Sequence, residues 1–111
     1  MPLESGTFSV PNLLISRIPC LYSGDTSYSE AVIENGANCD LFIHEATYPD
    51  TRAYEAQKYG HSTVSDAFRA FESSNSKMFI PTHMSIDSMD QAISMKTSNI
   101  IIPTEGKEYD I

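Results

Sequence analysis

Short apolar runs separated by polar and turn residues mark most of this chain. Five of them are short enough to predict buried strands: Leu13–Ser16, Cys20–Tyr22, Cys39–His44, Lys77–Pro81 and Asn99–Ile102. Between these runs the apolar residues recur at helical rather than alternating spacing. The pattern therefore predicts strands that alternate with single helices.

Three segments carry the helical pattern. Tyr28–Asn35 ends at Gly36, a residue suited to stopping a helix, and Met89–Met95 forms a second short helix. The third follows Thr63-x-x-Asp66, a sequence typical of a capping box, with apolar residues at helical spacing: Val64, Ala67, Phe68 and Phe71. Alternating strands and helices predict an α/β layered domain, in which strand ends give way to functional loops.

Two segments fit neither pattern. Met1–Pro11 is a mixed lead-in segment with at most one edge strand. Glu45–Gly60 is polar and rich in tyrosine, and we expect a loop there with one helical turn around Tyr54–Lys58. Long loops inside a compact domain are often functional.

Length and charge restrict the number of domains and the kinds of partner that the chain can have. The chain has 111 residues and 41% apolar residues, which predicts one globular domain over residues 1–111. Its net charge of −8 disfavours a broad nucleic-acid-binding surface, because such a surface needs positive charge. A bound pair of dications, or a basic partner chain, would offset part of this charge.

Cysteines and hydropathy indicate the compartment. Cys20 and Cys39 form no CxxC pair and lie in apolar surroundings, so we expect buried thiols rather than a disulfide framework. No apolar run approaches the length of about 20 residues that a membrane span needs. The first ten residues lack the order of a signal peptide. We therefore expect a cytoplasmic protein without a membrane partner.

Four chemically active side chains follow predicted strands or open a helix. Asp25, His44 and His83 come directly after apolar runs, and His61 closes the tyrosine-rich loop. Each has a plain structural reading, since Asp25 suits a helix cap and a lone histidine is usually a hydrogen-bonded structural residue. Together, they predict a metal or catalytic site at one rim of the sheet.

The motifs around these residues occur in a characteristic order. They are Tyr22-Ser23-Gly24-Asp25-Thr26, Ile43-His44-Glu45-Ala46-Thr47, Gly60-His61-Ser62-Thr63 and Thr82-His83-Met84-Ser85. This order resembles the C-terminal half of the ribonuclease Z family, tRNA 3′-processing endonucleases of the metallo-β-lactamase superfamily. The resemblance implies one half of an αβ/βα sandwich, a mixed sheet with helices on one face. It also implies hydrolysis of a phosphodiester by an enzyme with two zinc ions.

The resemblance also implies a role for each matched residue. Asp25 would bridge the two zinc ions and His83 would bind one of them, while His61 would be the general acid for the leaving ribose oxygen. Ser62 and Thr63, at a helix start, would donate hydrogen bonds to the scissile phosphate. By the same resemblance three residues would support these groups without binding metal: His44, Glu45 and Thr47.

Part of the family pattern is absent. The zinc-binding sequence His-x-His-x-Asp-His does not occur in this chain, so we expect inactivity without an N-terminal half or a second subunit that supplies it. We expect one face of the sheet to be left bare. The complete enzyme is expected to be a homo-oligomer.

The substrate stays open at this point. Precursor tRNA is the first expectation, but the chain has no basic arm, and Ile86-Asp87-Ser88 follows the His83 motif where tRNA-processing members commonly have Arg-Tyr. A related phosphodiesterase acting on cyclic nucleotides or other small phosphodiesters is one alternative. A non-catalytic binding domain of the same fold is the other.

Overall fold

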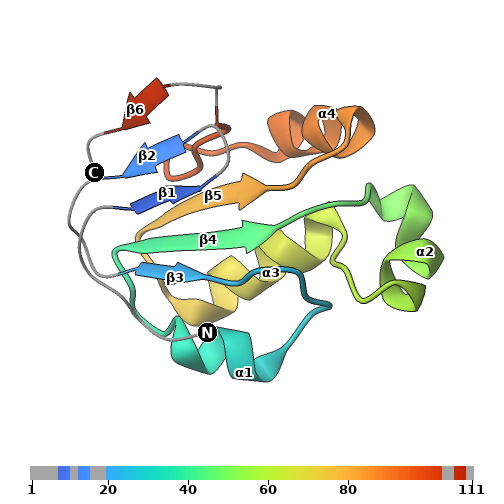
Figure 1. Cartoon of the computed structure of the whole chain (residues 1–111), viewed down its shortest axis with the longest axis horizontal. Helices are drawn as coiled ribbons and strands as arrows, with labels where there is room; N and C mark the ends of the chain where they lie inside the picture. Colours follow the sequence, from blue (N-terminus) through green and yellow to red (C-terminus); the bar gives the residue numbers. More distant parts are fainter. Residues whose placement is uncertain (1–7, 11–12, 16–19, 104–106, 110–111) are drawn as a thin grey trace.

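A three-stranded parallel sheet forms the centre of the protein. The computed structural model describes residues 8–10, 13–15, 20–103 and 107–109 (Figure 1). In the sheet, β4 (Leu41–Glu45) lies between β3 (Cys20–Tyr22) and β5 (Met78–Thr82). The parallel register brings the ends of all three strands to the same edge. The prediction of an α/β domain is confirmed.

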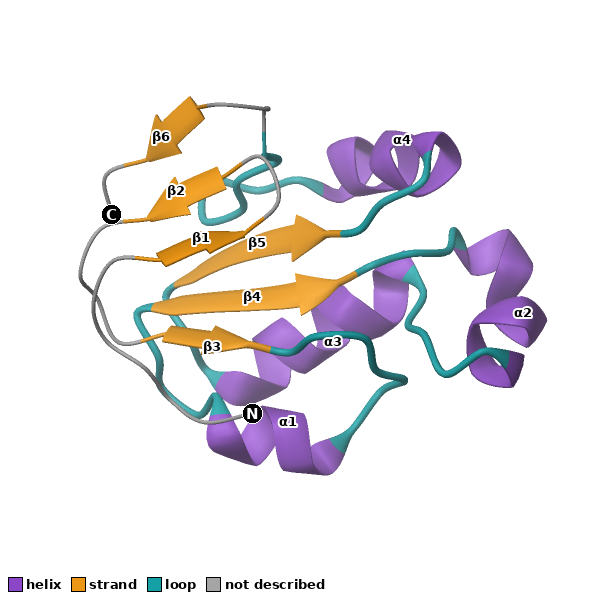
Figure 2. Ribbon diagram, in the orientation of Figure 1, coloured by secondary structure: helices purple, strands orange, loops and turns teal. Residues whose placement is uncertain are grey.

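Two helices cover one face of this sheet, as Figure 2 shows. They are α1 (Glu30–Asn35) and α3 (Val64–Ser74), which contact each other, and α3 also contacts β4 and β5. The core beneath α3 is aromatic: the Phe79 ring stacks on Phe71 and meets Phe68 edge-on, each at 5.1 Å between centroids. Phe79 is fully buried, so this cluster anchors the helix whose start carries the candidate site.

The remaining helices lie beyond the carboxyl ends of the strands. A 3-10 turn, η1 (Asp50–Arg52), leads directly into α2 (Ala53–Lys58), and α4 (Ile86–Met95) follows β5 (Figure 1). The helical turn predicted around Tyr54–Lys58 is therefore present and somewhat longer. No helix in the described part of the chain is long and apolar enough to cross a membrane.

A second small sheet contains strands from both ends of the described chain. β1 (Phe8–Val10) pairs antiparallel with β2 (Leu13–Ile15), and β2 pairs parallel with β6 (Lys107–Tyr109). β1 is an edge strand, as expected for the lead-in segment, of which residues 1–7 and 11 lie outside the described residues.

Three predicted elements differ from the structure by more than a residue or two at a strand end. The first helix starts at Glu30 rather than Tyr28 because Ser29 caps it, its side chain accepting from the Val32 amide at 3.4 Å. The helix predicted over 89–95 starts earlier, at Ile86, after a capping box that Ser85 begins. The strand predicted over 99–102 is reduced to a single bridge between Ile100 and Phe79.

The sheet face opposite α1 and α3 is not bare. Cys20, Leu41, Ile43 and Ile80 point to that face and none is more than 2% exposed. The expectation of an uncovered face is therefore wrong for these strands. Cys39 is also buried, on the helical side, so both thiols lie inside as predicted.

Candidate functional site

The turn after β3 brings Asp25 to the rim of the sheet. Gly24 adopts a positive φ of 66°, a conformation that glycine reaches without strain. Before it, Ser23 is tied to β4: its amide donates to the Ile43 carbonyl at 2.9 Å, and its hydroxyl accepts from the Glu45 amide at 3.2 Å. The exposed Asp25 carboxylate is thereby held beside the end of β4. It does not cap α1, because Ser29 does.

Glu45 is the buried centre of the site. Its side chain is 1% exposed and accepts hydrogen bonds from His61 Nδ1, from the Ser62 amide and, at 3.0 Å, from the Thr47 hydroxyl. An ionised carboxylate only accepts, so the His61 Nδ1 atom carries the proton of this bond. The other ring nitrogen, Nε2, is then the one available to a ligand. His61 is 23% exposed and thus reachable.

The segment from α2 to α3 places His61. Gly60 turns the chain with a φ of 72°, and the His61 amide donates to the Ala56 carbonyl at 2.8 Å. Thr63 then caps α3: its hydroxyl accepts from the Asp66 amide at 3.1 Å, and the Asp66 carboxylate accepts from the Thr63 amide at 3.2 Å. The predicted capping box is confirmed. His61 is therefore held between its own backbone bond to Ala56 and the capped start of α3.

Ser62 and Thr63 are buried in this arrangement. Ser62 is fully buried. Its amide donates a hydrogen bond to the Glu45 carboxylate, and its hydroxyl donates one to the Thr26 carbonyl. Thr63 is 5% exposed, and its amide is used in the capping box. Their predicted contact with a phosphate stays a prediction. The structure shows another use of these groups: they tie the loops after β3 and β4 to the start of α3.

His44 lies on the opposite face of β4 from Glu45. It is fully buried, its ring stacks on Phe42 at 5.7 Å between centroids, and its Nδ1 atom donates to the Glu45 carbonyl at 2.8 Å. Burial lowers the pKa of His44 below 6.5, while the Glu45 carbonyl and the nearby charges of Glu45 and Asp66 oppose the shift. The ring is thus kept neutral and holds the end of β4 in place.

Thr47 links the site to α4. Its hydroxyl lies 3.0 Å from Glu45 Oε2 and 3.4 Å from His61 Nδ1. Its carbonyl accepts from the Ser88 hydroxyl at 2.8 Å in the first turn of α4. Thr47 is therefore joined both to the buried carboxylate and to the helix that follows His83.

The described residues contain a single group of three or more side chains able to hold a metal ion. It consists of Asp25, Glu45 and His61, whose ligand atoms all lie within 4.8 Å of one another. His83 is not in this group; it is exposed at the end of β5 with a φ of 57°. The structure thus gathers Asp25 with the predicted general acid, and leaves His83 on the next strand end.

These donors are chemically suited to zinc as part of a site. The carboxylate of Asp25 and the imidazole of His83 are ordinary zinc ligands, both exposed at the rim. Glu45 and His61 are hydrogen-bonded to each other, so their facing atoms are already occupied. A zinc site needs three or four protein ligands. The described residues fit zinc but do not complete its coordination.

The tyrosines of the long loop divide into two sets. Tyr48 packs near the site, with its ring 6.0 Å from the His61 ring and the Arg52 guanidinium 5.0 Å from its centroid. Tyr54 and Tyr59 are 73% and 59% exposed. Only Tyr48 therefore contributes to holding His61, while the other two project from α2 and its end.

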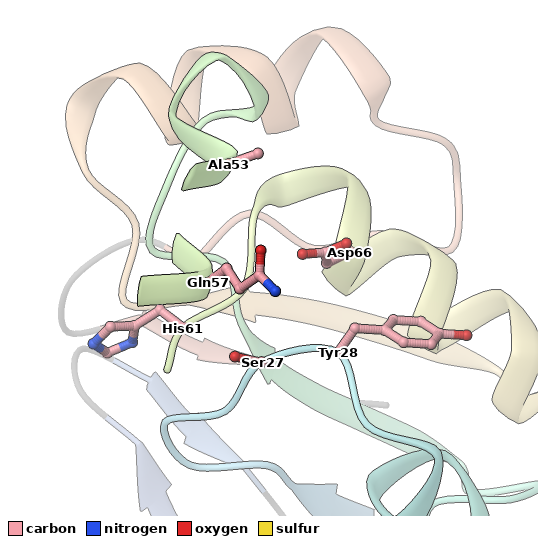
Figure 3. A pocket seen from close by; sticks show the side chains of 6 residues that line it. All are labelled: Ser27, Tyr28, Ala53, Gln57, His61 and Asp66. Atoms are coloured by element: carbon pink, nitrogen blue, oxygen red, sulfur yellow. The ribbon is translucent and has the colours of Figure 1, made fainter. Parts of the chain in front are cut away.

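A pocket beside His61 was not foreseen from the sequence. It has a volume of about 300 Å³, and Figure 3 shows the side chains that line it: Ser27, Tyr28, Ala53, Gln57, His61 and Asp66. Three separate segments contribute these residues. No spacing in the sequence links them, and Asp66 was identified only as a capping residue.

Comparison with known proteins gives a consistent relationship. No family model matches the sequence. The ribonuclease Z of Ignicoccus hospitalis is 33% identical over 95 residues, covering 86% of this chain and 32% of the relative. That of Haloferax volcanii is 34% identical over 98 residues, covering 82% and 31%. The chain thus spans about a third of the length of these relatives.

Two solved structures are similar. Human tRNase Z, short form (ELAC1), is 30% identical with a TM-score of 0.56 over 62% of this chain and 27% of the other. The metallo-β-lactamase fold protein YhfI of Bacillus subtilis has a TM-score of 0.65 over 93% of this chain and 45% of the other; at 16% identity it shows the fold alone. The chain belongs to the ribonuclease Z family of the metallo-β-lactamase superfamily, and spans part of its fold.

Proposed function

We propose that this chain supplies part of the active site of a zinc-dependent endoribonuclease that removes the 3′ trailer of precursor tRNA. The observation that carries the proposal is the hydrogen bond from His61 Nδ1 to the buried Glu45 carboxylate, next to Asp25. This bond fixes one tautomer of the ring and leaves Nε2 at the surface. A fixed imidazole beside a metal-ligating carboxylate suits proton transfer in phosphodiester hydrolysis.

His61 protonates the leaving ribose oxygen in this proposal. Its ring is hydrogen-bonded to Glu45 and packs against the tilted ring of Tyr48. Glu45 is a positioning residue in this proposal, because its buried carboxylate accepts from the His61 ring, the Ser62 amide and the Thr47 hydroxyl. Thr47 and the Ser62 amide complete the set of donors that keep Glu45 in place.

Asp25 and His83 would hold the metal. Zinc, when bound, supplies the Lewis acidity that activates water and stabilises charge on the phosphate. Two ions are proposed, with the remaining ligands supplied by an N-terminal half or by a second subunit. A homo-oligomer is the proposed form of the complete enzyme.

The test uses the chain itself. We expect purified residues 1–111 to show no cleavage of precursor tRNA at any zinc concentration. Zinc binding, measured by equilibrium dialysis, should be weak and should weaken further in Asp25→Asn and His83→Asn. Glu72→Gln, on the exposed surface of α3, is the matched control. Cleavage by the chain alone would contradict the proposal that its site is incomplete.

A second candidate is a phosphodiesterase acting on small phosphodiesters such as cyclic nucleotides. The net charge of −8 favours it, because a large RNA surface is repelled by an acidic protein. Side-by-side assays of a completed enzyme on precursor tRNA and on cyclic nucleotides separate the two, since exclusive tRNA cleavage removes this candidate.

A further inference from the structure

We infer that the pocket beside His61 binds one nucleoside of the substrate, the one whose ribose oxygen leaves. The inference rests on the proposed function and adds a subsite to it. His61 lines the pocket, whereas Asp25 does not. In a phosphoryl transfer the attacking and leaving groups lie on opposite sides of phosphorus. The pocket thus lies on the His61 side of the site, where we place the nucleoside attached to the leaving oxygen.

The size of the pocket suits a single nucleoside. Its volume of about 300 Å³ lies at the lower end of the range of about 300–1,000 Å³ that small-molecule sites occupy. A dinucleotide would need more room. The pocket is also open to solvent, so a nucleoside can remain attached to the rest of a chain.

The charge of the pocket excludes a phosphate as its occupant. No lysine or arginine lines it, and the Asp66 carboxylate does. A phosphate dianion beside that carboxylate would be repelled. The occupant is instead a neutral group with hydrogen-bond donors, which describes a base and its ribose.

Arg69 holds two walls of the pocket together from outside. Its guanidinium donates to Asp66 at 3.3 Å and packs over the Tyr28 ring at 4.0 Å from the centroid. The second Asp66 oxygen accepts from the Thr63 amide in the capping box. The carboxylate and the phenol ring are thus fixed before any ligand arrives, which lowers the entropy cost of binding.

Gln57 is the adaptable polar group. It projects from α2 into the pocket, with His61 at one end and Tyr28 and Asp66 toward the other (Figure 3). Its amide both donates and accepts, while Asp66 only accepts. A base that presents an exocyclic amine to these groups is favoured, which describes adenine, cytosine and guanine. Uracil has a carbonyl oxygen in place of the exocyclic amine and offers only its N3–H as a ring donor, so it is disfavoured.

The experiment titrates the chain of residues 1–111 with adenosine, cytidine, guanosine, uridine and inorganic phosphate, following its NMR spectrum. We expect saturable shifts at Tyr28, Gln57 and His61, with uridine binding about three- to tenfold more weakly than the best nucleoside. Phosphate should leave the pocket signals unchanged. Gln57→Ala should weaken binding by a similar factor, while Glu72→Ala, at an exposed position of α3 away from the pocket, should not.

The possible results distinguish a failure of the nucleoside site from a failure of the proposed function. No saturable shift at the pocket with any nucleoside, or equal binding by Gln57→Ala and the parent chain, would overturn the inference. Phosphate binding in the pocket would overturn it as well. Nucleoside binding together with failure of a completed enzyme to cleave any phosphodiester would instead count against the proposed function and leave the nucleoside site standing. Because Gln57 is exposed and makes no described contact that the fold needs, its loss should not unfold the chain.

Discussion

Glu45 and His61 are joined by a hydrogen bond from the imidazole Nδ1 atom to a carboxylate that is almost completely buried. The two residues lie 16 positions apart, on a strand end and on the turn before a helix. The bond ties the His61 ring to the end of β4 through Nδ1 and leaves Nε2, the other ring nitrogen, toward the rim. In the proposed function, Glu45 therefore orients the His61 ring through the nitrogen that does not transfer the proton.

Glu45→Gln is expected to remove the hydrogen bond that fixes the His61 tautomer, while the other side chains of the site stay in place. An amide of the same size cannot accept from the His61 ring and the Ser62 amide as a carboxylate does, so the imidazole should lose its single tautomer. Nitrogen NMR of the imidazole should show mixed Nδ1 and Nε2 protonation. Activity of a completed enzyme should fall about 10- to 100-fold. Glu72→Gln serves as the matched control, and an unchanged tautomer in Glu45→Gln would refute the positioning role.

Thr63→Ala should destabilise the fold through α3. The substitution removes the side chain that accepts from the Asp66 amide, and loss of such a cap costs about 1 kcal/mol. Urea unfolding should show this loss of free energy. Thr51→Ala, at an exposed position of η1, should unfold like the parent chain. Equal unfolding midpoints for the two variants would mean that the capping box contributes nothing.

The free energy of unfolding should decrease as the pH is lowered below about 6.5, because of His44. Burial lowers the pKa of His44 in the folded state, so the unfolded chain binds the proton more readily. Unfolding therefore takes up a proton below the ordinary histidine pKa of about 6.5, and the free energy of unfolding decreases as the pH is lowered. His44→Leu should flatten this dependence between pH 7.5 and 5. His83→Asn, at an exposed histidine, should keep it; a slope unchanged in His44→Leu would contradict the assignment.

Gly36→Ala should be destabilising for steric reasons alone. Gly36 has an ordinary negative φ, so the backbone is not strained. An added Cβ atom would lie 2.7 Å from Cε1 of the buried Phe42 ring and 3.0 Å from Leu21 Cδ2. Overpacking of this kind costs about 1–3 kcal/mol. Asn35→Ala, at the neighbouring exposed position, is the control in thermal unfolding. Matching transition temperatures for the two variants would show that the core accommodates the added methyl group without a loss of stability.

The sequence anticipated the three strands of the central sheet and the capping box because these follow from local pattern. Cys20–Tyr22 and the start of α3 after Thr63 needed only apolar spacing and a cap. The run at 99–102 was mistaken for a strand because its apolar residues pack against β5 while only one bridge forms. Apolarity alone does not distinguish a packed segment from a paired strand.

The candidate site was partly foreseen for a different reason. Motif order brought Asp25, His61 and Glu45 to attention, and the structure groups all three. The burial of Ser62 was not visible from sequence, since it depends on the Thr26 carbonyl 36 residues earlier. The pocket formed by Tyr28, Gln57 and Asp66 likewise arises only when three distant segments meet.

The most direct measurement uses a chimera. This chain would replace the matching 95-residue region of the Ignicoccus hospitalis ribonuclease Z, to which it is 33% identical. Cleavage of precursor tRNA would then be measured under single turnover for the chimera, its His61→Ala and Asp25→Asn variants, and the Glu72→Gln control. The account predicts 3′-trailer removal that the first two substitutions reduce at least about 100-fold and the control leaves unchanged. A zinc-loaded, active chimera whose His61→Ala variant cleaves as fast as its parent would contradict it.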